Sequence, residues 1–308
     1  MRVALTGTSG FIGAATARAL AIAGHEVVGL VRPTSRRNHV KNAVSRFVVG
    51  DQADRASWSN LLEGAHALVH NSLDRGALDR SDLEAHLSSN LVGSILLLED
   101  ARRAGVQRVV FVSSVAVHHD IRPRWAGAHL VDEDHPLRPR SLYGAYKAAI
   151  EAHLWAFHHT YGIHAVAVRP AAVYGVDPCL ERSHGYQQVR KLLHSERVSK
   201  ADFPGGGKWV HVDDVALAIV RSLERDAAAG KPFHLADCYA KFTRLGEHAA
   251  GFLGLPQTMV EPDTAPAAMN TFDKTAAREI LGVPLSRGDN GLKAYAADLV
   301  NAVKANAE

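Results

Sequence analysis

A chain of 308 residues with 47% hydrophobic content can bury a full core, as one large domain or as a large and a small one. Its formal net charge of +3 is too small to indicate a nucleic-acid partner. The two cysteines, Cys179 and Cys238, are far apart, which fits a reducing compartment and predicts neither a disulfide framework nor a zinc site. We recognise no signal peptide and no apolar run near the ~20 residues of a membrane helix, so we expect a cytoplasmic protein with no membrane partner.

The first elements in chain order predict a strand, a glycine-rich turn and a helix. Residues 2–5 form a short apolar run, and residues 11–23 have the pattern of an alanine-rich helix that ends at Gly24. A second apolar run at 27–31 completes a βαβ unit. Glycines in such a turn let the backbone approach a pyrophosphate, which would lie at the positive end of the helix. The residues expected to contact this dinucleotide are Gly7, Thr8, Ser9, Gly10, Phe11, Ile12 and Gly13.

Farther along, short apolar runs alternate with longer helical patterns. The runs lie at 47–49, 67–70, 109–113 and 165–169, and helical segments such as 83–104 and 143–161 separate them. This alternation predicts an α/β fold of the doubly wound Rossmann type, a parallel sheet with helices on both faces. After residue 174 the pattern loosens. We expect there a helix at 212–224, a strand at 233–236, a surface loop at 263–270 and further helices to the end.

Tyr143 and Lys147 stand four residues apart on the expected helix 143–161. A free tyrosine has a pKa of ~10 and is a poor general base at neutral pH, whereas a fixed positive charge nearby favours its phenolate. A lysine one helical turn away supplies that charge. The spacing alone also arises by chance in helices. In combination with the upstream glycine loop, it predicts hydride chemistry.

With these features the chain resembles the extended short-chain dehydrogenase/reductase family, which includes the NAD-dependent epimerases and dehydratases. The resemblance covers most of the chain. It implies a Rossmann domain at 1–174 and a smaller substrate-binding lobe at 175–308, with a strand and a helix near 210–240 that return to the Rossmann part. The motifs that carry it are 6–13, Gly50-Asp51, Asn90, 111–114, 143–147, Arg169-Pro170, 173–175 and 210–215.

The resemblance also implies the roles of the site residues. Ser114 would bond the substrate oxygen, Tyr143 would move the proton, and Lys147 would hold both the pKa of the tyrosine and the nicotinamide ribose. Asp51 resembles the adenine-contacting acid of the family, and Asn90 would support the site from the middle of a helix. The cofactor contacts expected outside the glycine loop are Arg32, Arg36, Asp51, Gln52, Asn71, Asn90, Tyr143, Lys147, Pro170 and Val173.

The choice of cofactor depends on the end of the second strand, where an acidic residue would bond the adenosine ribose of NAD. Arg32 stands there instead, and Thr34, Ser35, Arg36 and Arg37 follow. A cationic, hydroxyl-rich segment suits a ribose 2′-phosphate, so we expect NADP more than NAD. A solvated basic loop is the alternative, and NAD remains open.

Departures from the nucleotide-sugar enzymes of the family bear on the substrate. Those enzymes usually carry an asparagine where this chain has Ala171-Ala172, and an arginine where it has Gly207-Lys208-Trp209. His118 replaces their usual tyrosine. We therefore expect an NAD(P)-dependent oxidoreductase that acts on the carbonyl or secondary alcohol of a small substrate without a nucleotide. The alternatives are a nucleotide-sugar epimerase or dehydratase that returns the hydride, and a non-catalytic protein that senses NADP.

Eighteen histidines raise the question of a metal site. Adjacent pairs such as His118-His119 and His158-His159 point in different directions and do not chelate, so we expect no metal. The family position of His118 and His119 predicts that one of them contacts the substrate. The resemblance further implies a homodimer formed through the helices at 83–104 and 143–161.

Overall fold

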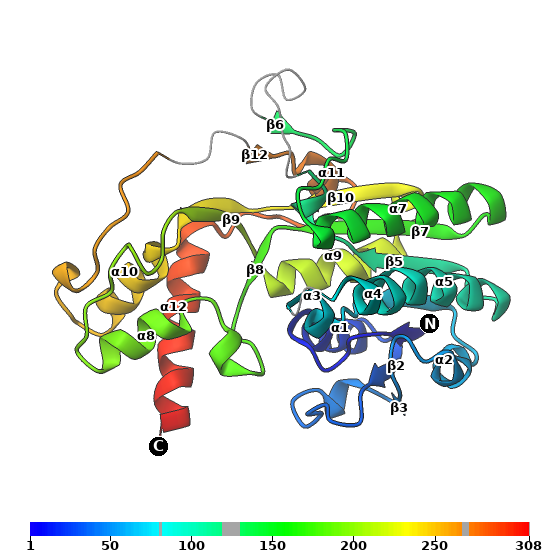
Figure 1. Ribbon diagram of the computed structural model, residues 1–308, viewed down its shortest axis with the longest axis horizontal. Helices are drawn as coiled ribbons and strands as arrows, with labels where there is room; N and C mark the ends of the chain where they lie inside the picture. Colours follow the sequence, from blue (N-terminus) through cyan, green and yellow to red (C-terminus); the bar gives the residue numbers. More distant parts are fainter. Residues whose placement is uncertain (80–81, 119–129, 267–270, 308) are drawn as a thin grey trace.

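The central element of the fold is a seven-stranded sheet (Figure 1). The computed structural model describes residues 1–79, 82–118, 130–266 and 271–307. Strand order is β10-β7-β5-β4-β1-β2-β3, and every neighbouring pair is parallel. This confirms the predicted Rossmann-type α/β fold. The strands are β1 Arg2–Leu5, β2 Glu26–Val31, β3 Arg46–Val49, β4 Ala67–His70, β5 Arg108–Val112, β7 His164–Pro170 and β10 Lys231–Leu235.

Helices cover both faces of this sheet because successive strand residues point to opposite sides. Val3 and Leu5 pack in one apolar cluster with α1 (Phe11–Ile22) and α9 (Val212–Glu224). Ala4, between them, packs in a second cluster with α2 (Arg55–Leu62), α5 (Gly93–Arg103) and α7 (Leu142–Tyr161). Strands β1, β2, β4, β5 and β7 bury both of their faces, which explains why they read as continuous apolar runs, whereas Val49 of the edge strand β3 is exposed.

Helix α7 has well-defined ends that fix its position against the sheet. Ser141 caps its N-terminus, where the side chain accepts a hydrogen bond from the backbone N–H of Gly144 at 3.1 Å. At the C-terminus Gly162 has a φ of 69°, the left-handed conformation that ends helices and that glycine adopts without strain. Tyr143 and Lys147 therefore lie in the first two turns, close to the carboxyl end of β5.

The second part of the chain forms a smaller lobe beside the sheet (Figure 1). Its three strands are ordered β11-β9-β8, with β8 Ala172–Tyr174, β9 Gly206–His211 and β11 Cys238–Lys241. Helices α8 (Tyr186–Leu193), α10 (Thr243–Phe252) and α12 (Gly288–Ala307) pack with these strands around a third apolar cluster. Between β9 and β11 the chain returns to the large sheet as α9 and β10.

Shorter elements lie near the carboxyl ends of the sheet strands. Two segments far apart in the chain, β6 and β12, pair in parallel. His119 and the end of the expected loop 263–270 lie outside the described residues. No described helix has the length and hydropathy of a membrane span. These shorter elements are α3 Arg75–Asp79, α4 Leu83–His86, a π-helical turn Leu87–Val92, a 3₁₀ turn Val115–His118, β6 Leu130–Val131, β12 Thr271–Phe272 and α11 Thr275–Glu279.

Candidate active site

The glycine loop between β1 and α1 is tightly folded. Gly7 has a φ of +68°, and its carbonyl accepts a hydrogen bond from the Gly10 N–H at 3.0 Å. A Cβ atom on Gly13 would lie 2.0 Å from the Gly7 oxygen, so the first turn of α1 can approach the loop only without a side chain there. Thr8 is buried and its hydroxyl donates to the Leu5 carbonyl at 2.7 Å, which anchors the loop to β1.

The N-terminus of α1 is suited to an anion. No side chain caps it, and its first turn holds no acidic residue, so backbone N–H groups and the helix dipole face outward from Gly10. Gly10 is exposed, and Ser9, Phe11 and Ile12 are half-buried. The loop therefore fits a dinucleotide pyrophosphate both sterically and electrostatically.

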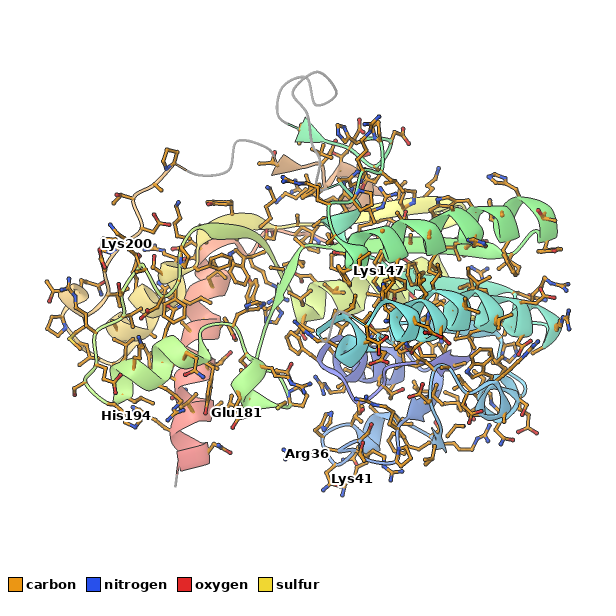
Figure 2. All side chains as sticks on the ribbon, in the orientation of Figure 1. Arg36, Lys41, Lys147, Glu181, His194 and Lys200 are labelled. Carbon is orange, nitrogen blue, oxygen red and sulfur yellow. The ribbon has the colours of Figure 1, made fainter. Side chains whose placement is uncertain are left out.

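Other expected cofactor contacts follow the carboxyl ends of neighbouring strands. Arg32 follows β2 and is exposed, as is Arg36, which projects from the same loop (Figure 2). The backbone N–H of Arg32 donates to the Ser35 hydroxyl at 3.1 Å. Asp51 follows the adjacent strand β3, is exposed, and accepts a hydrogen bond from the Ala53 N–H at 2.9 Å. Asn71 follows β4, and its N–H donates to the Thr6 hydroxyl at 3.0 Å.

Gln52 and Asn90 lie deeper, in a buried polar cluster. The Asn90 oxygen accepts hydrogen bonds from Gln52 Nε2 at 2.8 Å and from the Asp74 N–H at 2.7 Å. Its amide nitrogen donates to the Asp74 carbonyl at 3.1 Å. Asn90 belongs to the π-helical turn, so it interrupts an otherwise regular helix. Its amide holds together the segments after β3 and β4, in keeping with the supporting position expected for it.

Two expected contacts lie at the end of β7 and just beyond it. Pro170 is the last residue of that strand and is buried, and Val173 follows in β8. Val173 is half-buried and packs in an apolar cluster with Phe11 and Ile12 of α1. The chain between the two sheets thus passes beside the N-terminus of the helix that carries the glycine loop.

Ser114, Tyr143 and Lys147 meet at the end of β5. Tyr143 is hydrogen-bonded to the Ser114 side chain. Lys147 is buried, its Nζ donates to the Val112 carbonyl at 2.6 Å, and it lies 5.7 Å from the centre of the Tyr143 ring. Figure 2 labels Lys147 near the first half of α7. The three side chains that the sequence singled out therefore form one cluster.

The electrostatics of this cluster depend on burial. Burial raises the pKa of Tyr143, and the hydrogen bond from Ser114 partly offsets that shift. Burial also lowers the pKa of Lys147 to about 7, while the nearby Glu151 carboxylate favours the ammonium form. A lysine with a pKa near neutrality and a hydrogen-bonded phenol together are suited to proton transfer.

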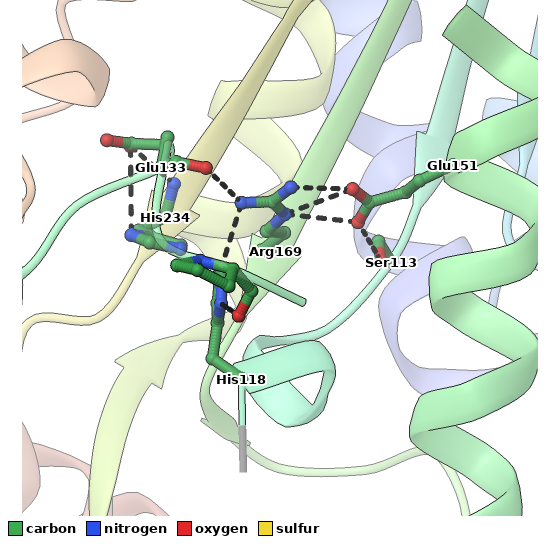
Figure 3. Close-up of polar contacts among 7 residues, drawn as sticks. Ser113, His118, Glu133, Glu151, Arg169 and His234 are labelled. Atoms are coloured by element: carbon green, nitrogen blue, oxygen red, sulfur yellow. Dashed lines mark hydrogen bonds and ion pairs between the residues drawn. The ribbon is translucent and has the colours of Figure 1, made fainter. Parts of the chain in front are cut away.

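A second polar group behind this cluster was not foreseen from the sequence (Figure 3). Glu151 and Arg169 form a buried ion pair with Nη2 to Oε2 at 2.7 Å, and Ser113 donates to Glu151 Oε1 at 2.5 Å. His118 is fully buried, with Nε2 at 3.1 Å from Arg169 Nη1. His118 is therefore part of this internal network, while His119, the other histidine considered for a substrate contact, lies outside the described residues. Glu151 could have been found from the sequence, because it lies four residues after Lys147 and therefore one helical turn further along α7.

Sequence comparison places this geometry in a known context. A model of the NAD dependent epimerase/dehydratase family matches residues 3–236. The chain belongs to this family. A UDP-glucose 4-epimerase of Mycolicibacterium smegmatis is 32% identical over 92% of the chain and 93% of its own length. A ketoreductase of Stigmatella aurantiaca that acts on a farnesylated dihydroquinoline oxide is 30% identical over 77% of the chain and 68% of its own length.

Solved structures of the family share the whole fold. The dTDP-glucose 4,6-dehydratase of Streptomyces venezuelae, solved with NAD bound, has a TM-score of 0.79 and 26% identity, covering 99% of this chain and 98% of its own. A UDP-glucose 4-epimerase of Thermotoga maritima has a TM-score of 0.80 at 21% identity, with 100% of both chains covered. The relatives thus include epimerases, dehydratases and reductases on one scaffold.

Proposed function

We propose that this family member is an NADP-dependent oxidoreductase that interconverts a carbonyl and a secondary alcohol on a small substrate without a nucleotide. The observation that carries the proposal is the cluster of Ser114, Tyr143 and Lys147 after β5, at the same carboxyl edge of the parallel sheet from which the glycine loop follows β1. When bound, the nicotinamide supplies or takes up the hydride. Ser114 would hold the substrate oxygen by a hydrogen bond, and Tyr143 would donate its hydroxyl proton to that oxygen in the reductive direction.

Lys147 would lower the cost of the Tyr143 phenolate through its ammonium charge and would also bond the nicotinamide ribose. The glycine loop and the N-terminus of α1 would hold the pyrophosphate. The other cofactor contacts in the proposal are Arg32, Arg36, Asp51, Gln52, Asn71, Asn90, Pro170 and Val173.

The substrate class is argued from two small residues at the junction with the lobe. Ala172 of β8 and Gly207 of β9 stand where the resemblance places the diphosphate contacts of nucleotide-sugar enzymes. A Cβ atom on Gly207 would lie 3.5 Å from the Phe242 ring, so its surroundings are apolar. Lys208 lies on the opposite face of β9, with Nζ 5.6 Å from the centre of the Phe272 ring. A smaller, less charged substrate suits these residues better than a nucleotide diphosphate.

The preference for NADP rests on Arg32 and Arg36. Both are exposed in the loop after β2, and no carboxylate follows that strand directly. A guanidinium is free to bond a 2′-phosphate in a bidentate manner there.

A nucleotide-sugar epimerase is the second candidate, favoured by the 32% identity to the Mycolicibacterium epimerase over nearly the full length of both chains. A protein that only senses the cofactor is less favoured because Tyr143 and Lys147 are both retained and in contact with the site. We also propose a cytoplasmic enzyme with its Rossmann domain at 1–174 and its substrate lobe at 175–308. Helix α9 packs on the large sheet and strand β10 belongs to it, which supports a Rossmann domain and a substrate lobe that are interleaved along the chain.

A homodimer is proposed through the helical segment from α4 to α5. Leu83, Leu87, Val92 and Leu96 are all exposed along it. The π-helical turn places an extra residue between Leu87 and Val92, which brings these two side chains towards the same face. A row of exposed apolar side chains of this kind is typical of a protein contact surface.

The test begins with purified protein that is denatured to release and identify any retained nucleotide. It continues with NADPH oxidation over a panel of small ketones and aldehydes, and with UDP-glucose as the comparison. We expect exchangeable NADP, turnover of carbonyl compounds, and no epimerisation of UDP-glucose. Stoichiometric retained NAD together with epimerisation would overturn the proposal in favour of the second candidate.

A Tyr143→Phe variant tests the assignment of the proton donor. It removes the hydroxyl and keeps the ring, so we expect loss of turnover with cofactor affinity within about twofold of wild type. Near-wild-type turnover in this variant would refute the role of Tyr143.

A further inference from the structure

Three side chains of α7 contact the end of β5, each at a different residue. Tyr143, Lys147 and Glu151 follow one another at intervals of four and therefore share one face of the helix. Lys147 bonds the carbonyl of Val112, and Tyr143 bonds the Ser114 side chain. Glu151 accepts the bond from the residue between them, Ser113. The segment that carries Ser114 is thus held by three successive turns of one helix.

The position of Glu151 is unusually well determined. Its side chain is 0% exposed and that of Arg169 is 3% exposed, so the pair is shielded from water. Arg169 contacts both carboxylate oxygens, through Nε at 3.1 and 3.2 Å and through Nη2 at 2.7 Å. Its Nη1 donates to the Glu133 carbonyl at 2.9 Å and faces His118 Nε2 (Figure 3). A carboxylate fixed in this way can hold Ser113 in a single position.

The backbone of Ser113 transmits this constraint to Ser114. The Ser113 N–H donates to the Val168 carbonyl at 2.8 Å, in the neighbouring strand, while its hydroxyl donates to Glu151. Two of its polar groups are therefore fixed by different elements. Because Ser114 is the next residue, the same contacts restrain the backbone from which its side chain extends, and the Ser114 hydroxyl also accepts a hydrogen bond from the Ala116 N–H at 3.2 Å.

We propose that Glu151 is a positioning residue of the site, which holds Ser114 in place through Ser113 and keeps Lys147 protonated beside Tyr143. The inference rests on the proposed function, in which Tyr143 transfers the proton. It assigns to Glu151 a task distinct from that of Lys147. Glu151 touches neither the substrate oxygen nor the proton-transferring hydroxyl; it acts through Ser113 and through its charge.

The direction in which the charge of Glu151 shifts the pKa of Lys147 is definite. Glu151 favours the ammonium form of Lys147, whereas burial opposes it. A Glu151→Gln substitution removes the negative charge and leaves the positive charge of Arg169 uncompensated in the same buried region. Both changes disfavour the ammonium of Lys147. The pKa of Lys147 must therefore fall, and the phenolate of Tyr143 loses its stabilising cation.

In the part of the chain that the structure describes, the other ionisable groups around Lys147 do not supply a negative charge in place of Glu151. His70 of β4 is buried, and burial together with the charge of Lys147 lowers its pKa to about 3, so it is neutral. Burial raises the pKa of Tyr146, whose ring lies 4.8 Å from Lys147 Nζ, so this phenol is neutral as well. The Tyr143 phenol also has a raised pKa. Glu151 is thus the carboxylate whose charge supports Lys147.

The first test measures Lys147 directly and needs no substrate. Protein with ¹³C-labelled lysine side chains is titrated by NMR with saturating NADP, and the Lys147 signal is assigned by its loss in Lys147→Arg. We expect the Lys147 pKa to fall by about one unit in Glu151→Gln, a tenfold change in its ionisation constant. Glu151→Asp keeps the charge and should retain most of the wild-type value. An unchanged Lys147 pKa in Glu151→Gln would overturn the inference that Glu151 keeps Lys147 protonated.

A matched control is Glu99→Gln on α5. Glu99 also pairs with arginines, Arg102 at 2.8 Å and Arg103 at 2.6 Å, but its side chain is 22% exposed and both ion pairs lie within α5 itself. The Lys147 titration should be unchanged there. A shift of equal size in Glu99→Gln would show that the effect is not specific to Glu151, and would also overturn the inference.

A Ser113→Ala variant tests whether Glu151 positions Ser114 through Ser113. This substitution leaves both charges of the Glu151–Arg169 ion pair in place, so it also serves if Glu151→Gln fails to fold. We expect kcat to fall about tenfold to a hundredfold with little change in KM or in the pH profile. In Glu151→Gln the rising limb of kcat/KM for alcohol oxidation should also move to higher pH. Wild-type kcat in Ser113→Ala would overturn the positioning part. If no carbonyl compound is turned over by the wild type, the proposed function fails, while the Lys147 titration still decides the charge effect.

Discussion

A Gly13→Ala substitution should open the dinucleotide loop. The added Cβ atom would lie 2.0 Å from the Gly7 oxygen and 2.8 Å from its carbonyl carbon. Real Cβ contacts stay beyond 3.0 Å, so the loop and the helix must separate by about 1 Å. Alanine is favoured over glycine within a helix by about 1 kcal/mol, but overpacking of this kind costs typically about 1–3 kcal/mol, so we expect a net loss of stability.

The larger effect should be on the cofactor. The N–H groups of the loop and of the first turn of α1 must all converge on one pyrophosphate, and a displacement of about 1 Å breaks that convergence. We expect the Kd for NADP and for NAD to rise at least about tenfold, measured by isothermal titration calorimetry, with urea denaturation reporting stability.

Gly251→Ala serves as the control for helix propensity. Gly251 lies in α10, and its added Cβ would meet only Gln257 Nε2, at an ordinary 3.6 Å. This variant should be as stable as wild type or more stable by up to about 1 kcal/mol, with unchanged cofactor affinity. If Gly13→Ala binds the cofactor as tightly as Gly251→Ala does, the steric reasoning about the loop is wrong.

Three further predictions concern the cofactor, pH and assembly. Arg32→Asp should raise the Kd for NADP at least about tenfold and leave that for NAD nearly unchanged; equal weakening of both would exclude a 2′-phosphate contact. The pKa of Lys147 is lowered from 10.5 to about 7, so the unfolded chain binds more protons across that range and stability rises with pH. In protein without cofactor, Lys147→Met should reduce the slope of the unfolding free energy against pH, measured by urea denaturation, by up to about 1.4 kcal/mol per pH unit. An unchanged slope would contradict the lowered pKa of Lys147. Leu87→Glu should convert a dimer to monomer in light scattering; a variant that stays dimeric would place the interface elsewhere.

Local patterns were enough to predict most elements of the large sheet and the two best-defined motifs. Most strands of the sheet are short, apolar and bounded by polar or glycine residues, which distinguishes them from the longer helices. The glycine loop and the pairing of Tyr143 with Lys147 depend on close spacing in the chain, so they too were visible. The end of helix α7 at Gly162 follows from the same local chemistry.

Features made by contacts between distant segments were not predicted. The π-helical turn at Leu87–Val92 forms around Asn90, whose partners Gln52 and Asp74 come from two other loops. The buried position of His118 was not predicted either, because its partner Arg169 lies 51 residues away in β7. The conformational preferences of residues near His118 in the chain contain no information about such a distant partner.

The amino-acid sequence was enough to predict a parallel α/β sheet with a glycine-rich loop and a helix that carries Tyr143 and Lys147, because backbone geometry and side-chain alternation act over a few residues. Tertiary structure decided how Ser114 is held against that helix and how strongly burial shifts the pKa of Lys147. Burial and ion pairing depend on which segments pack together. The Glu151–Arg169 ion pair, and the stabilisation of the Lys147 ammonium by the Glu151 carboxylate, therefore form only when α7 packs against the strands.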